Sequence, residues 1–139
     1  MNKLLIVLIA VFLILAISFI YLNQSQRTVK ISPMKNEFGY YDISSAELND
    51  MLSKKDFLLV DVHMPEQKHI NGTDIFIPYD ELSSNLNKLP TDKNAKIVLY
   101  CRSGAMSGVA SKNLVSKGYT NIYNLKNGLN EWKSLGYPL

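Results

Sequence analysis

The stretch around Cys101 constrains the fold more than any other part of the sequence. Residues 97–100 (IVLY) form an apolar run that is too short for a helix and has the length of a buried strand. Apolar residues then recur at helical spacing over 109–117, which places Val109 on the buried face and Ser111 on the exposed face. Small or polar residues join the two segments. The sequence therefore predicts a strand that ends in a tight loop and leads directly into a helix.

Cys101 is the only cysteine in the chain and stands at the start of this loop. A loop between a strand and a helix turns backbone N–H groups inward, and the first turn of the helix adds partial positive charge. A lone cysteine is commonly a small buried apolar side chain, but here Arg102, Ser103 and Ser107 follow it. A thiol at a helix N-terminus beside a cation ionises readily. We therefore interpret Cys101 as a reactive thiol.

Charge and cysteine content exclude several classes of function. The 139 residues include 15 Lys and Arg and 12 Asp and Glu, and all three charged residues before position 31 are basic. The rest of the chain is therefore formally neutral, and without a basic stripe we expect no nucleic-acid partner. One cysteine cannot form an intramolecular disulfide or a cysteine-rich zinc site. We expect no metal and no organic cofactor.

The N-terminus contains an apolar run of nineteen residues, 4–22, in which Ser18 is the one clearly polar member. About 20 residues cross a bilayer, whereas the apolar part of a cleaved signal peptide has about 7–15. We therefore predict that residues 1–30 contain an uncleaved, single-pass transmembrane signal anchor, followed by a polar linker over 31–41. Positive charges on the two sides nearly balance. Export by such a segment would place the domain, 42–139, outside the cytoplasm.

Strands and helices are expected to alternate along the domain. Ser44 and Glu47 fit the two positions of a capping box and predict the start of a helix. Strands are predicted at 57–62, 74–77, 97–100 and 121–125, with helices after Ser44, Pro78, the Cys101 loop and Asn127, and a short turn or helix over 66–69. This alternation predicts an α/β domain with a mainly parallel sheet.

Three blocks, in this order and spacing, resemble the rhodanese-like superfamily. They are LLVDVHMPEQKHINGTDIFIP (58–78), IVLYCRSGAMS (97–107) and GYTNIYNLKNGLNEW (118–132). The resemblance covers 42–139 and implies a three-layer fold with a mainly parallel central sheet flanked by helices. It also implies a sulfurtransferase, in which Cys101 takes sulfane sulfur from thiosulfate or a persulfide and passes it to a thiol or cyanide-type acceptor. Asn127, where a second glycine is more usual, is a mild departure.

The resemblance further implies a substrate-binding loop after the cysteine. Its residues are Arg102, Ser103, Gly104, Ala105, Met106 and Ser107. Backbone amides of this loop would hold the terminal sulfur and any anionic group of the donor. Family members that use thiosulfate commonly carry a basic residue where this chain has Met106. Because the positive charge is missing, Met106 favours a neutral, bulky or protein-borne persulfide over free thiosulfate.

Some of these residues have two interpretations. Arg102 either binds an anionic donor or points to solvent. Ser107 either donates a hydrogen bond to the persulfide or caps the following helix. Gly104 is expected to need positive φ or close backbone contact. Asp61 ends a predicted strand, where parallel-sheet sites form, and is expected to support the loop.

Two histidines belong to the first block. The family's Asp-Val-Arg is Asp-Val-His at 61–63, and we expect His63 to be half-exposed at the strand end and able to bond Glu66. We expect His69 to be a structural part of the turn that follows, and not the partner of Cys101 in a catalytic pair.

Two other classes of function compete with a sulfurtransferase. The altered loop could belong to a binding or sensing module that docks a protein partner without turnover. Cysteine phosphatases and arsenate reductases instead need Cys-x5-Arg, and here Ser107 holds the arginine position, so a phosphoryl dianion has no bidentate partner. The expected partners are a small sulfur donor or a protein persulfide, and the membrane through 4–22. We expect a monomer.

Overall fold

The computed structural model describes residues 2–25 and 34–139. The chain divides into two units, Met1–Ser32 and Pro33–Leu139, which we describe separately. Residues 26–33, which contain part of the predicted linker, lie outside the described residues.

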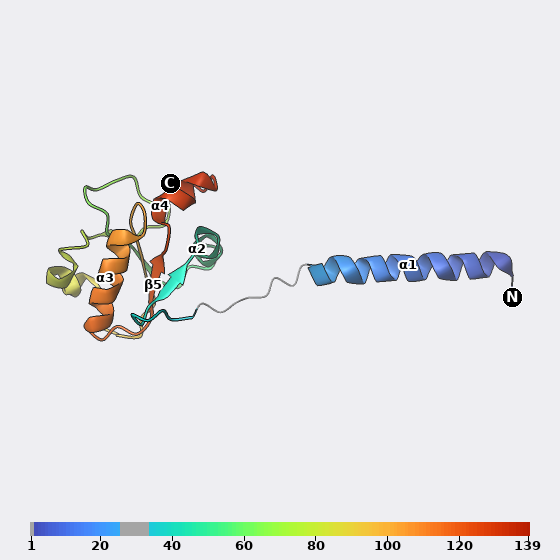
Figure 1. The fold of residues 1–139 in the computed structure, drawn as a ribbon, viewed down its shortest axis with the longest axis horizontal. Coiled ribbons are helices and arrows are strands. Elements are labelled where there is room, and N and C mark those ends of the chain that lie inside the picture. Colours follow the sequence, from blue (N-terminus) through green and yellow to red (C-terminus); the bar gives the residue numbers. More distant parts are fainter. Residues whose placement is uncertain (1, 26–33) are drawn as a thin grey trace. The chain divides into compact units, whose positions relative to one another are not determined.

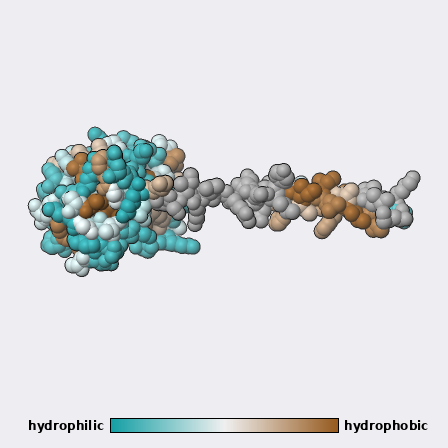
Figure 2. Space-filling model, turned by 60° about the horizontal axis from the view of Figure 1, so that its bottom comes forward, coloured by the Kyte–Doolittle hydropathy of each residue, from teal (hydrophilic) through white to brown (hydrophobic). Residues whose placement is uncertain are grey.

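The first unit contains one helix, α1 (Lys3–Ser25), among its described residues. Phe12 and Phe19 are two of its exposed apolar side chains, and its described surface is largely hydrophobic in Figure 2. No helix in the described ranges combines the length and the apolar character needed to cross a membrane. The predicted transmembrane anchor is therefore not confirmed.

The second unit is built on a five-stranded sheet in the order β1-β5-β4-β2-β3. Its strands are β1 (Tyr41–Ile43), β2 (Leu58–Asp61), β3 (Ile75–Phe76), β4 (Ile97–Tyr100) and β5 (Ile122–Leu125). All four pairs of neighbouring strands are parallel. The central strand, β4, is buried along its whole length. The predicted parallel α/β sheet is thus confirmed, and the strand that precedes Cys101 lies at its centre.

Helices cover both faces of the sheet, and Figure 1 shows α2 and α3 on opposite sides of β5. One face packs against α3 (Ala105–Ser116) and the 3-10 helix η1 (Leu82–Lys88), and the other against α2 (Ser45–Leu52) and α4 (Gly128–Ser134). Side chains of β4 alternate between the two cores. Leu99 and Cys101 face the α3 core, whereas Tyr100 packs with Trp132 in the opposite core.

The helix α2 begins as the sequence predicts. The Ser44 hydroxyl accepts a hydrogen bond from the Glu47 N–H at 3.3 Å, and the Glu47 carboxylate accepts one from the Ser44 N–H at 2.7 Å. This reciprocal pair satisfies two backbone donors that the first turn leaves without helical partners. The carboxylate of Glu131 in α4 accepts the next amide, that of Ser45, at 2.9 Å.

Two helix predictions are wrong in detail. The helix predicted after Pro78 is the short 3-10 helix η1, interrupted by Asn85 at φ −117° and ψ 24°. Leucines three and four residues apart fit both kinds of helix, so their spacing did not separate them. Residues 66–69 form no helix and run as an irregular segment.

The buried face of α3 also differs from the prediction. Val109 is 54% exposed, whereas Ser111 is completely buried. Ser107 and Gly108 are buried on the same side of the helix. Leu114 is also completely buried. Small side chains allow the helix axis to approach the sheet closely, so size as well as hydrophobicity selects the residues of this face.

Candidate active site

Cys101 follows β4 directly and lies against the first turn of α3. Gly104 is the N-cap residue of α3 and has a left-handed backbone, with φ 89°. The Cys101 sulfur accepts a hydrogen bond from the Gly104 N–H at 3.2 Å and lies 3.5 Å from the Ser107 hydroxyl. The cysteine is only 1% exposed. The thiol therefore faces the N-terminus of a helix, whose backbone N–H groups can donate to sulfur, in a site with little access to water.

Gly104 is required both by its backbone conformation and by its surroundings. A Cβ atom added there would lie 1.8 Å from the carbonyl oxygen of Lys126. The expectation of positive φ or close backbone contact therefore holds on both counts. The loop after Cys101 is thus packed directly on the segment that follows β5.

A second close contact joins the site to α4. A Cβ atom added to Gly128 would lie 2.3 Å from the carbonyl oxygen of Cys101. The amides that follow, those of Leu129 and Asn130, donate to the carbonyls of Cys101 and Arg102 at 3.0 and 2.9 Å. The N-terminus of α4 therefore fixes the backbone that carries the thiol, which is the physical reason for the glycine in the third sequence block.

The structure separates the predicted loop into exposed and buried residues. Arg102, Ser103 and Ala105 are exposed, Met106 is partly buried against the α3 core, and Gly104 and Ser107 are buried. The expectation that Ser107 caps α3 is wrong, because Gly104 is the N-cap. Ser107 lies within the first turn, and its hydroxyl is placed beside the sulfur.

The sequence reasoning missed a set of polar residues behind Ser107. The Ser107 hydroxyl donates to Asn124 Oδ1 at 2.6 Å, and Asn124 Nδ2 donates to Asp42 Oδ1 at 2.8 Å. The other carboxylate oxygen of Asp42 accepts a hydrogen bond from Asn36 Nδ2 at 3.0 Å. One signal was available, because Asn124 is a polar residue within the otherwise apolar predicted strand 121–125.

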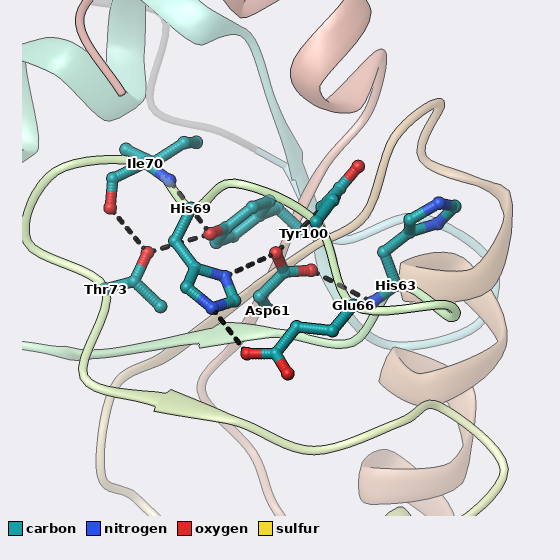
Figure 3. Close-up of polar contacts among 8 residues, drawn as sticks. Asp61, His63, Glu66, His69, Ile70, Thr73 and Tyr100 are labelled. Carbon is teal, nitrogen blue, oxygen red and sulfur yellow. Dashed lines mark hydrogen bonds and ion pairs between the residues drawn. The ribbon is translucent and has the colours of Figure 1, made fainter.

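Asp61 belongs to a different polar group, on the other face of the sheet. Its completely buried carboxylate accepts hydrogen bonds from the His63 N–H and from His69 Nδ1, both at 2.9 Å (Figure 3). Asp61 pairs in register with Tyr100, whose side chain lies in the α2 and α4 core. Asp61 therefore holds the segment that follows β2. It does not support the Cys101 loop as expected, because the Cys101 side chain points into the core on the other face of the sheet.

One of the two histidines, His63, differs from its predicted environment. His63 is 7% exposed rather than half-exposed, and among the described residues its buried Nδ1 has no hydrogen-bond partner. Glu66 contacts His69 at 3.1 Å instead, so the His69 ring lies between two carboxylates while the His63 ring points away from them (Figure 3). Partial burial lowers the pKa of His69, but the hydrogen bonds to Asp61 and Glu66 outweigh it and raise that pKa overall.

Comparison with known proteins gives the family of the chain. Residues 44–135 match the sequence profile of the family described as Rhodanese-like domain. The chain belongs to the rhodanese-like domain family. This rhodanese-like domain also superimposes on the crystal structure of a rhodanese-like domain protein from Staphylococcus aureus, with a TM-score of 0.58 and 27% identity over 66% of this chain and 89% of that one.

Two relatives of the rhodanese-like chain carry names that refer to sulfur transfer. A "Sulfurtransferase" of Allochromatium vinosum is 31% identical over 101 residues, which are 70% of this chain and 92% of that protein. "Thiosulfate sulfurtransferase PspE" of Escherichia coli is 37% identical over 68 residues, which are 47% of this chain and 64% of that protein. These relatives support sulfur transfer at the level of the family.

No cluster in the described part of this rhodanese-like chain is arranged to hold a metal ion with three or more His, Cys, Asp or Glu side chains.

Proposed function

We propose that this protein is a sulfurtransferase in which Cys101 carries the transferred sulfur as a persulfide. One observation carries the proposal: the Cys101 sulfur lies 3.2 Å from the Gly104 N–H, at the N-terminus of α3. Backbone N–H groups at a helix N-terminus can donate hydrogen bonds to a sulfur that carries negative charge. The same donors can stabilise the negative charge of a terminal sulfur once it is attached.

The transfer takes place in two displacements. In the first, the Cys101 thiolate attacks the outer sulfur of the donor, a new S–S bond forms, and the donor's own S–S bond breaks. The leaving group, sulfite from thiosulfate or a thiolate from a persulfide, departs with the electron pair. In the second, a thiolate or cyanide attacks the outer sulfur of the Cys101 persulfide, and the Cys101 thiolate is released.

Burial of the thiol restricts the donor. Because Cys101 is 1% exposed, only a donor that ends in a sulfur atom can bring that atom to the thiolate. The exposed Arg102 follows Cys101 on the same loop and can attract an anionic donor. Met106 supplies no charge, so we propose that a persulfide is used in preference to thiosulfate.

The test is the intact mass of the full chain, kept in mild detergent, after incubation with thiosulfate or with a low-molecular-weight persulfide. We expect a gain of about one sulfur atom that cyanide or a thiol removes. A Cys101→Ser variant is the control and should gain nothing. The persulfide should load the protein faster than thiosulfate.

Failure to load with either donor would overturn the proposal. The domain would then be interpreted as a binding module that docks a protein partner at the loop of Arg102 to Ser107. Equal loading by both donors would keep the persulfide intermediate but reject the role given to Met106.

We also propose that residues 4–22 attach the protein to a membrane and place the domain outside the cytoplasm as a monomer. The nineteen-residue apolar run in the sequence supports the attachment to a membrane. The test is extraction of cell membranes at high pH followed by protease treatment of intact cells. Release of the protein by the extraction would contradict its attachment to the membrane. Protection of the domain from protease would contradict its placement outside the cytoplasm.

A further inference from the structure

The Ser107 hydroxyl has one proton and three acceptors within reach. Asn124 Oδ1 lies at 2.6 Å, the Gly104 carbonyl at 3.2 Å and the Cys101 sulfur at 3.5 Å. A hydroxyl donates only one hydrogen bond at a time but can also accept. The short distance to Asn124 directs the proton away from the sulfur. The oxygen of Ser107 is then free to accept the proton of a Cys101 thiol.

The orientation of the Asn124 amide is fixed by its other end. Asn124 Nδ2 donates to Asp42 Oδ1 at 2.8 Å, and Asn124 is 4% exposed. A carboxylate accepts hydrogen bonds but does not donate them, so the NH2 group must face Asp42 and the oxygen must face Ser107. The Asn36 amide holds the second oxygen of the Asp42 carboxylate at 3.0 Å and keeps it in place.

We propose that Asn124 is a positioning residue of this site, which, held by Asp42, draws the Ser107 proton away from the Cys101 sulfur and so restrains the thiol until a donor arrives. When sulfur is charged, as a thiolate or as a persulfide, the hydroxyl turns to donate to it and gives up the bond to Asn124. Asn124 therefore holds the hydroxyl away from sulfur while the thiol is protonated, and releases it to the sulfur once the sulfur is charged. The proposal deepens the proposed function, but it concerns the thiol itself and can be tested without turnover.

Charged groups around the thiol could act on it independently of this hydroxyl. They are Arg102 on the same loop, Asp42 behind Asn124, and the Asp61–His69 pair on the opposite face of the sheet. A test must therefore separate the orientation of the hydroxyl from the charge of Asp42.

The experiment is the rate of alkylation of Cys101 by iodoacetamide from pH 5 to 9, in the full chain. Since this is the only cysteine, the whole signal comes from it. Replacing the amide by an apolar group of similar size, Asn124→Leu, frees the hydroxyl to donate to sulfur. We expect the midpoint of the rate profile to fall by about one pH unit, which makes alkylation about tenfold faster below the midpoint.

A double-mutant cycle identifies the path of the effect. In a Ser107→Ala background the hydroxyl is absent, so adding Asn124→Leu should change the alkylation rate less than about twofold. Asp42→Asn removes the charge but keeps an amide oxygen for Asn124, and should give a smaller change than Asn124→Leu. If Asn124→Leu does not fold, by circular dichroism, Asn124→Val replaces it in the same cycle.

Two results would overturn the proposal. One is an equal acceleration by Asn124→Leu with and without Ser107, which would mean that the hydroxyl is not involved. The other is a folded Asn124 variant whose alkylation profile is unchanged or shifted to higher pH. Neither result depends on persulfide formation, because the mass experiment measures that separately on the unaltered chain.

Discussion

The carbonyl oxygen of Cys101 rests on the backbone of Gly128, so the site depends on a residue that carries no side chain. We expect Gly128→Ala to destabilise the fold by more than about 2 kcal/mol and to abolish sulfur loading, because its Cβ would lie 2.3 Å from that oxygen and its φ is +56°. Urea unfolding and intact mass would measure the two effects.

A matched control for this prediction exists at Gly118. It has φ +88°, but nothing lies within 4 Å of an added Cβ. Gly118→Ala therefore isolates the cost of a left-handed backbone, about 1–2 kcal/mol, and should leave sulfur loading intact. Equal effects of the two substitutions on stability and on sulfur loading would show that the contact between Gly128 and Cys101 contributes to neither.

Met106 determines the second prediction at the scale of single residues. Its side chain is uncharged and partly buried against the α3 core, at the start of the helix beside the thiol. We expect Met106→Arg to raise kcat/KM for thiosulfate about tenfold or more, because it adds a positive charge for a dianionic donor. Activity with a neutral persulfide should not rise. Met106→Gln, which is polar but uncharged, is the control, and an equal gain in that variant would reject the explanation by charge.

At the scale of elements, the capping box of α2 is a local device with a measurable contribution. Ser44→Ala removes the side chain that accepts from the Glu47 N–H. We expect a loss of about 1 kcal/mol in the free energy of unfolding, measured in urea. Ser53→Ala, at the other end of α2, removes a hydroxyl bonded to the Asp50 carbonyl and should cost less. The reverse order would contradict the importance of the N-terminal cap.

Local sequence patterns predicted the helices and strands well where neighbouring residues in the sequence determine them. The strands at 58–61 and 97–100 lie within short apolar runs, and the spacing of Ser44 and Glu47 indicates the start of α2. The bond between Asn124 and Asp42 joins residues 82 positions apart. No local pattern encodes such a pair, so the polar residues behind Ser107 could not be assigned from the sequence.

The predictions that were wrong at the scale of elements have one physical cause. The buried face of α3 and the burial of His63 depend on how closely neighbouring elements approach, which the sequence of one element does not specify. A hydrophobicity pattern ranks Val109 above Ser111, but space against the sheet admits the smaller side chain. Tertiary packing therefore overrode the pattern at these positions.

At the scale of the whole molecule, His69 links stability to pH. Hydrogen bonds to Asp61 and Glu66 outweigh partial burial and raise its pKa in the folded protein above the unfolded value of about 6.5. Its contribution to stability is therefore fully present below about pH 6.5 and is lost as pH rises through the raised folded pKa. We expect the Tm of the wild type to exceed that of His69→Gln by a few degrees near pH 6, and this difference to shrink toward pH 8. A difference that stays constant over this range would contradict the linkage.

The placement of Gly128 and Asn124 after Cys101 also has a consequence for the order in which a ribosome makes this protein. The strand that bears the thiol and the helix beneath it, β4 and α3, emerge before β5 and α4, which supply Asn124 and the amides that bind the Cys101 and Arg102 carbonyls. A nascent chain that ends at α3 thus has its central strand open along one edge and its thiol unshielded. The surroundings of the thiol are therefore complete only when the segment that follows α3 has been translated and has docked on the sheet.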